Sequence, residues 1–341
     1  MELSEFYIPG GHRFFAIVSK YDDYLADVEK RPGYKAGDTL KLILPFLKAF
    51  GATDEGIKEF SRKNILLVPG AKEALCDIHT RMEAFLISTS YEPYIDALCD
   101  VVEFPKDRTY STQIALEKYF LKDEEKERLI HLAKEIREME MMEWPDKAKD
   151  LDDLSYRDQE TIQRLDRIFW KEIQEMEIGK ILSEVNPIGG KEKASALLHS
   201  LKRTGNRLED VIYIGDSITD VEAFDLVRRG RGITISFNGN RYALRSAEIA
   251  CLSSNAFILI ILADAFQKGG KEDLMEIVDR WSFNSLKSSR TDPKLIRRLE
   301  SLLSKEFPKV YRITDENRAM VIQKSEAFRK QVRGVKAGSL G

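Results

Sequence analysis

The chain has 341 residues, a length that fits one open α/β core with helical insertions better than two independent domains. Apolar residues make up 43% and charged residues 33% of the chain, a balance that excludes intrinsic disorder. The net charge of −3 excludes a general nucleic-acid binder, and no apolar run reaches the roughly 20 residues that span a bilayer.

The N-terminal stretch, residues 1–63, is predicted to be a helical cap. Its apolar side chains recur at steps of four and three, which places them on one face of a helix: Phe14, Val18, Tyr21, Leu25 and Val28. A second helix is expected over residues 39–50, and Thr53-Asp54 is expected to begin a third.

Residues 64–107 and 186–255 alternate short apolar runs with helix patterns, which is typical of a parallel α/β core. In the first part, a helix over residues 71–80 precedes a buried strand that ends at a Ser88-Thr89-Ser90 turn. The second part has predicted strands over residues 210–215, 232–237 and 247–251. These patterns predict a doubly wound, mostly parallel sheet with helices on both faces.

Two further segments surround this core. Residues 108–185 are predicted to be a charged helical insertion, whose apolar stripe through Ile162, Leu165 and Phe169 packs on the domain or on a partner. Residues 256–341 are predicted to be a helical C-terminal extension. The insertion is expected to be a second cap or a docking surface.

The cysteines point to a reducing compartment. Cys76, Cys99 and Cys251 form no Cys-x-x-Cys pair and are odd in number, so we expect buried free thiols. The first residues also lack the layout of a signal peptide. A cytoplasmic protein without direct membrane insertion is therefore expected.

The strongest chemical signal is the motif Gly215-Asp216-Ser217-Ile218-Thr219-Asp220, directly after a predicted strand. A carboxylate there lies at the carboxyl edge of the sheet, where open α/β proteins bind ligands, and Gly215 is expected to let the backbone turn. Carboxylates without Cys or His suit Mg²⁺, so Asp216 and Asp220 are the predicted metal ligands. The alternative interpretation is that both residues merely cap the next helix.

Two more groups are candidates to hold an anionic oxygen. The hydroxyl and backbone N–H groups of Ser88 and Thr89 form a possible cradle at a strand-to-helix junction, although a simple helix N-cap has the same pattern. Lys193, with Lys191 as the alternative, opens a helix after Gly189-Gly190 and is a candidate to neutralise a phosphate. An ordinary exposed lysine is the competing interpretation.

Taken in chain order, Pro69-Gly70-Ala71, Leu86-Ile87-Ser88, Lys193 and residues 215–220 resemble the haloacid dehalogenase-like hydrolase superfamily, on its phosphoserine-phosphatase-like side. The resemblance implies hydrolysis of phosphate monoesters with Mg²⁺. It also implies that Ser88, Lys193 and Asp216 are catalytic and that Asp220 is a supporting acid. Residues 21–25 and 237–244 are similar to an uncharacterised archaeal branch, which includes methanogen proteins labelled subunit R of energy-converting hydrogenase A.

One departure from the family pattern concerns the nucleophile. The family's chemistry begins with an Asp-x-Asp motif after the first strand, and no such motif occurs upstream of Ser88. Asp22-Asp23 is an acidic pair near an apolar run, but its spacing and the helical stripe argue against a strand there. We therefore expect the first strand and its aspartate to lie upstream of Met1, which predicts an inactive chain. A natural relative without a nucleophile is the alternative.

Three functions follow from these expectations. The first is a Mg²⁺-dependent phosphatase acting on a small phosphorylated substrate through an aspartyl-phosphate in the complete protein. The second is a non-catalytic accessory subunit of an archaeal energy-converting hydrogenase, with residues 108–185 as the docking surface. The third is a phosphoprotein-binding module that keeps Ser88 and Lys193 and dispenses with Asp216.

Overall fold

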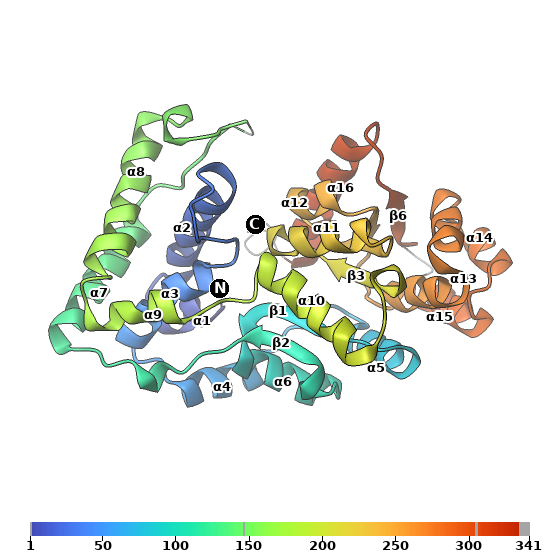
Figure 1. Cartoon of the computed structure of the whole chain (residues 1–341), viewed down its shortest axis with the longest axis horizontal. Coiled ribbons are helices and arrows are strands. Elements are labelled where there is room, and N and C mark those ends of the chain that lie inside the picture. The colour runs from blue at the N-terminus through green and yellow to red at the C-terminus, as the bar shows by residue number, and fades with distance from the viewer. Residues whose placement is uncertain (1, 146, 304–305, 334–341) are drawn as a thin grey trace.

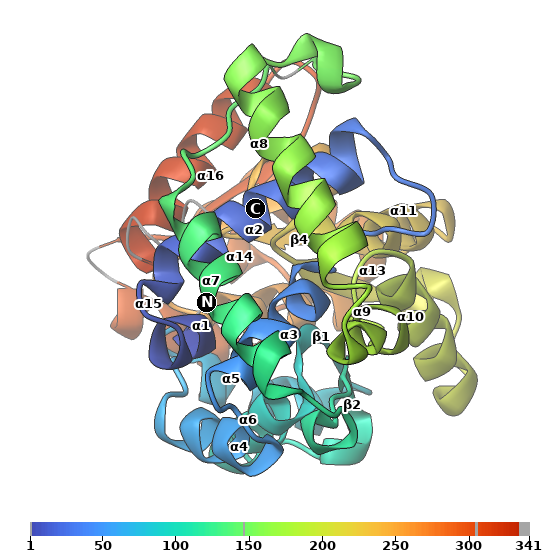
Figure 2. The same ribbon diagram turned by 90° about the vertical axis from the view of Figure 1, so that its left-hand side faces the viewer.

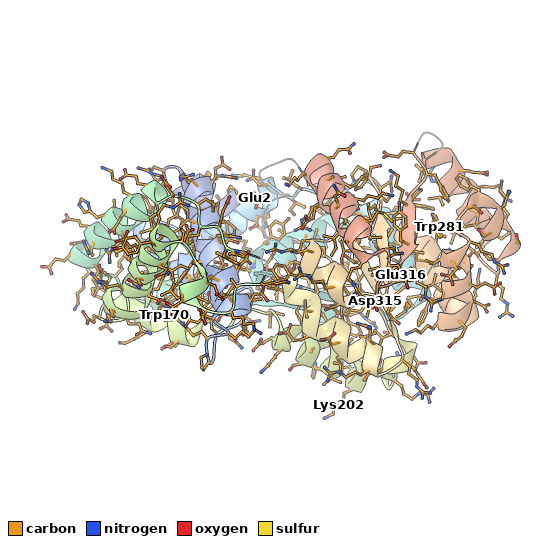
Figure 3. All side chains as sticks on the ribbon, turned by 90° about the horizontal axis from the view of Figure 1, so that it is seen from above. Glu2, Trp170, Lys202, Trp281, Asp315 and Glu316 are labelled. Atoms are coloured by element: carbon orange, nitrogen blue, oxygen red, sulfur yellow. The ribbon has the colours of Figure 1, made fainter. Side chains whose placement is uncertain are left out.

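The chain folds into a helical lobe and an α/β lobe, which Figure 1 shows side by side. The computed structural model describes residues 2–145, 147–303 and 306–333. Met1 and the C-terminal residues 334–341 of the predicted extension lie outside the described residues. In the view from above, Trp170 lies in the helical lobe and Trp281 lies at the far end of the α/β lobe (Figure 3).

The helical lobe is built from two stretches of chain on either side of the first sheet. Its helices are α1 (Glu2–Tyr7), α2 (Gly11–Asp23), α3 (Thr39–Ala49), α4 (Asp54–Lys63), α7 (Asp123–Glu138), α8 (Tyr156–Arg167) and α9 (Ile181–Glu184). As the sequence predicts, the side chain of Thr53 caps α4 by accepting a hydrogen bond from the Gly56 N–H. Figure 2 shows α7 and α8 lying over the N-terminal helices.

The two stretches share one hydrophobic core. Phe46 of α3 contacts Phe14 of α2 with ring centroids 4.9 Å apart, and it contacts Phe169, just after α8, at 6.1 Å. Tyr21 stacks on the same Phe169 at 5.7 Å. Neither stretch could bury these rings alone, so the cap and the insertion form a single lobe. The domain limits at residues 63, 107 and 185 stay predictions.

The α/β lobe contains two sheets whose strands are mostly parallel. Strand β1 (Leu86–Tyr91) pairs in parallel with β2 (Thr109–Thr112). The second sheet has the order β3-β4-β5-β6, formed by β3 (Ile212–Gly215), β4 (Ile233–Phe237), β5 (Ile249–Leu252) and the antiparallel β6 (Lys309–Arg312). The predicted α/β class with a mostly parallel sheet and a helical cap is confirmed.

Two local predictions in this lobe are wrong. Residues 109–112 form a strand instead of the start of a helical insertion, because Thr-Tyr-Ser-Thr favours a pleated backbone that β1 pairs with. The predicted turn at Ser88-Thr89-Ser90 is the end of β1 itself, and α6 (Glu92–Val102) begins directly after the strand.

Helices cover the sheets and extend the lobe. They are α5 (Ala71–Arg81), α6, α10 (Lys191–Thr204), α11 (Val221–Arg229), α12 (Arg241–Ser246), α13 (Ile258–Asp279), α14 (Phe283–Ser288), α15 (Pro293–Leu303) and α16 (Arg318–Arg333). Val321 and Phe328 of α16 pack against Leu244 of α12 and Leu252 of β5. Among the described helices, none is long and apolar enough to cross a membrane.

Candidate functional site

The carboxyl end of β3 carries the predicted acidic motif, and Gly215 provides the space that the motif needs. A Cβ atom on Gly215 would lie 2.5 Å from Cγ of Asp220. Gly215 does not have a positive φ, so this position supplies space for Asp220 and does not use the left-handed backbone conformation open to glycine. The missing side chain instead lets the Asp220 carboxylate fold back against the end of the strand.

Asp220 is the centre of a buried hydrogen-bond network. Its Oδ1 accepts hydrogen bonds from Lys193 Nζ at 2.7 Å and from the Tyr213 hydroxyl at 3.0 Å. Its Oδ2 accepts from the backbone N–H groups of Asp216 at 3.0 Å and of Ser217 at 3.1 Å. Burial, followed by the charge of Asp220, holds the pKa of Tyr213 well above its usual range. Asp220 therefore fixes the loop that carries Asp216.

The structure distinguishes the two candidate lysines. Lys193 is 7% exposed and pairs with Asp220, whereas Lys191 is exposed at the start of α10. The preceding Gly190 has a φ of 55° and donates its N–H to the Thr219 carbonyl at 3.0 Å. This bond ties the start of α10 to the Asp216 loop, so Lys193, and not Lys191, reaches the acidic motif.

The end of β1 approaches the same place. A Cβ atom on Gly37, which belongs to the helical lobe, would lie 2.9 Å from the Thr89 methyl and 3.1 Å from the Thr219 methyl. Both methyl groups therefore lie within 3.1 Å of one point. The end of β1 at Thr89 and the loop after β3 at Thr219 therefore lie close together, with Gly37 between them. Ser88 is half-buried in β1, where its hydroxyl accepts a hydrogen bond from the Ser90 N–H at 3.2 Å.

The acidic pair of α2 has a structural role in the helical lobe. Asp22 accepts hydrogen bonds from the Tyr34 hydroxyl at 2.7 Å and from the N–H groups of Gly37 and Thr39 at 3.1 Å each. Burial raises the pKa of Asp22 to about 6, and that of its neighbour Asp23 to about 7. Asp22 thereby positions the loop of residues 34–38 over the candidate site.

Asp216 is in contact with an arginine that the sequence analysis did not identify. Nη1 of Arg329, on α16, lies 2.6 Å from Asp216 Oδ2 and 3.1 Å from the Asn238 carbonyl oxygen. One turn earlier, Ser325 donates its hydroxyl to the Gly239 carbonyl at 2.7 Å. A sequence signal existed, because an arginine shares the inner face of a helix with Val321, Ser325 and Phe328 at helical spacing.

The expected magnesium ion would need carboxylate oxygens that protein groups leave open to it. Both oxygens of Asp220 accept hydrogen bonds from protein groups, and Oδ2 of Asp216 pairs with Arg329. Across the part of the chain that the structure describes, no three His, Cys, Asp or Glu side chains gather as a metal-binding group. In the conformation shown, the residues do not fit a bound Mg²⁺, which needs open carboxylate oxygens.

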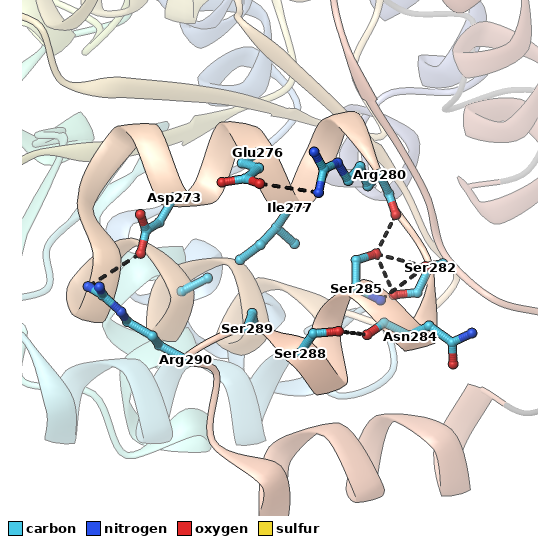
Figure 4. A pocket seen from close by; sticks show the side chains of 11 residues that line it. Asp273, Glu276, Ile277, Arg280, Ser282, Asn284, Ser285, Ser288, Ser289 and Arg290 are labelled. Carbon is cyan, nitrogen blue, oxygen red and sulfur yellow. Dashed lines mark hydrogen bonds and ion pairs between the residues drawn. The ribbon is translucent and has the colours of Figure 1, made fainter.

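A separate hollow of about 530 Å³ lies between α13 and α14 (Figure 4). Its two arginines pair with carboxylates at its rim, Arg280 with Glu276 at 3.3 Å and Arg290 with Asp273 at 3.4 Å. Its serines hydrogen-bond within the same segment, as when Ser282 caps α14. The residues that line the hollow are not part of the candidate site, and none of them is a buried charged side chain that points into the hollow.

Comparison with known proteins bears on the same residues. Residues 80–256 match a family model described as haloacid dehalogenase-like hydrolase. The structure is similar to that of gene product AF1437 from Archaeoglobus fulgidus, with a TM-score of 0.77 and 27% identity over 96% of this chain and 90% of that chain. A search of curated proteins found no match. The family match contains Ser88, Thr89, Lys193, Asp216 and Asp220, and it leaves out α16.

Proposed function

Because the chain belongs to the haloacid dehalogenase-like hydrolases, we propose that it is a phosphatase-type protein of the phosphoserine-phosphatase-like kind. Its site would bind the phosphate of a small phosphorylated substrate between Ser88, Thr89 and Lys193. The observation that supports this most directly is the buried pair of Lys193 and Asp220, which holds a cation beside the Asp216 loop.

Each of these residues has a role that follows from its chemistry. The ammonium group of Lys193 has three N–H donors, and its bond to Asp220 uses one of them. The others would donate hydrogen bonds to phosphate oxygens, and the positive charge would neutralise them. The Ser88 and Thr89 hydroxyl groups would donate hydrogen bonds to the same oxygens. The loop of residues 34–38 lies close enough to shield this site from solvent.

We further propose that the chain as given hydrolyses phosphate esters negligibly. Covalent phosphoryl transfer needs a nucleophile in line with the phosphorus atom. No Asp-x-Asp occurs upstream of Ser88, and Asp22 already accepts hydrogen bonds that shape the lobe loop. Magnesium dependence remains part of the proposal, and it requires Asp216 to release Arg329.

Binding of inorganic phosphate to the 341-residue protein, measured by isothermal titration calorimetry, tests the site. We expect Lys193→Met and Ser88→Ala to weaken binding at least tenfold, while Lys191→Met serves as the matched control and binds as the wild type does. A wild-type protein that binds no phosphate, or a Lys193→Met variant that binds it equally well, would contradict the proposal. Phosphate release from a panel of phosphate esters with Mg²⁺ would contradict the expected inactivity.

The archaeal resemblance supplies a second candidate, a non-catalytic accessory subunit of an energy-converting hydrogenase. The charged helices α7 and α8 on the outer side of the helical lobe are the surface proposed for docking (Figure 2). Co-purification of the protein with hydrogenase subunits would favour this candidate, provided that charge-reversal substitutions on α8 abolish it. The substitution Asp216→Asn distinguishes the third candidate, a phosphoprotein-binding module, from the other two. In such a module it should leave binding of a phosphoprotein intact.

A further inference from the structure

We infer that Arg329 and a divalent cation are alternative partners of Asp216. Metal binding then requires α16 to move away from its packed position against residues 238–239, α12 and β5. The inference rests on the proposed function, because it concerns the carboxylate to which the family resemblance assigns the metal. Arg329 lies outside residues 80–256, so the contact joins the matched part of the chain to a helix that the family model does not cover.

The geometry around Asp216 makes the two partners exclusive. Arg329 is 3% exposed, and its Nη1 lies 2.6 Å from Asp216 Oδ2, 3.3 Å from the Asp216 carbonyl oxygen and 3.1 Å from the Asn238 carbonyl oxygen. A divalent cation that coordinates Oδ2 would occupy the same space and would face the full charge of the guanidinium at contact distance. Arginine cannot relieve this repulsion by losing its proton.

Asp220 cannot replace Asp216 as the ligand of the cation. Its Oδ1 is bound to Lys193 and Tyr213, and its Oδ2 accepts two backbone N–H groups. Turning Asp220 toward a metal would strand the buried ammonium of Lys193 without its partner. The cation therefore depends on Asp216, whose side chain is 33% exposed and can be approached from solvent.

A small set of contacts holds α16 in place, so the helix can detach as one element. Arg329 and Ser325 hold its inner face against the turn at residues 238–239, while Val321 and Phe328 pack on α12 and β5. Because the metal ion and the packed α16 compete for Asp216, linkage requires that metal binding weakens the packing of α16 by the same factor by which that packing weakens metal binding. Metal binding should therefore loosen α16, and loosening α16 should tighten metal binding.

Calorimetric titration of Mg²⁺ into the full chain tests this competition. Arg329→Gln should bind Mg²⁺ at least tenfold more tightly than the wild type. The matched control is Lys330→Gln, which removes the same charge at the next, exposed position of α16 and should leave the affinity unchanged. Asp216→Asn should abolish binding in either background.

A second variant and a second readout protect the test against misfolding of Arg329→Gln. Ser325→Ala keeps every charge but removes one bond of α16 to the Gly239 carbonyl, so it should tighten Mg²⁺ binding a few-fold. In the wild type, saturating Mg²⁺ should speed amide hydrogen exchange across residues 318–333.

Several results would overturn the inference: unchanged or weaker Mg²⁺ binding by both α16 variants, binding that survives Asp216→Asn, or slower exchange in α16 on adding Mg²⁺. Absence of Mg²⁺ binding in every variant would overturn it as well. Phosphate binding that still depends on Lys193 would then show that the proposed function survives. If phosphate binding fails its test while Mg²⁺ and Arg329 still compete for Asp216, the proposed function fails and this inference stands.

Discussion

Replacing Lys193 by methionine should destabilise the protein strongly, because it leaves the Asp220 carboxylate buried without its cation. The two side chains are 8% and 3% exposed, and the ion pair measures 2.7 Å. Removing one partner of such a buried pair costs about 3–5 kcal/mol. Asp220 keeps its hydrogen bonds from Tyr213 and from two backbone N–H groups, so we expect the low end, about 3 kcal/mol.

Urea denaturation followed by far-ultraviolet circular dichroism measures this loss as a lower midpoint. Lys191→Met is the matched control, and an exposed substitution of this kind should change the unfolding free energy by less than about 0.5 kcal/mol. Adding Asp220→Asn to Lys193→Met should restore part of the stability, because it removes the stranded charge. If Lys193→Met unfolds at the same urea concentration as Lys191→Met, the argument for a tightly coupled buried pair is refuted.

Three other substitutions test the surroundings of the site. Gly37→Ala should cost more than Gly33→Ala, by about 1–3 kcal/mol, because both glycines have positive φ but a Cβ on Gly33 meets no atom within 4 Å; equal urea midpoints would rule out the close approach. Gly215→Ala should lower the thermal midpoint sharply by displacing Asp220, and an unchanged midpoint would contradict the 2.5 Å approach. Burial raises the pKa of Asp23 to about 7, above its value of about 3.9 in an unfolded chain. Its stabilising contribution is therefore present below about pH 4 and is lost as the pH rises through about 7. Asp23→Asn should flatten this fall in stability between about pH 4 and about pH 7, and an unaltered pH profile would show that the side chain is not buried as described.

Much of the architecture could be predicted because it follows local periodicity. The stripe through Phe14, Val18 and Tyr21 predicts α2, and the apolar runs ending at residues 215 and 237 predict β3 and β4. The meeting of Lys193 with the Asp216 loop also follows from a general rule, since loops at the carboxyl edge of a parallel sheet converge.

The remaining features depend on contacts that local patterns do not encode. Strand β2 is short and polar, and only its pairing with β1 defines it. The role of Asp22 depends on a loop that closes around it, although the sequence correctly argues against a strand at that position. Arg329 reaches Asp216 from a helix that is distant along the chain, so its helical spacing could suggest an inner-face arginine but could not identify its partner.

The single aromatic core of the helical lobe has a consequence for biosynthesis. Phe14 and Phe46 leave the ribosome long before Phe169, on which both α2 and α3 depend for burial. At typical elongation rates of ~5–20 residues per second, this delay is on the order of ten seconds. During that interval the nascent N-terminal helices expose their apolar faces, so chaperones that hold amphipathic segments should engage this chain early and release it once α8 has emerged.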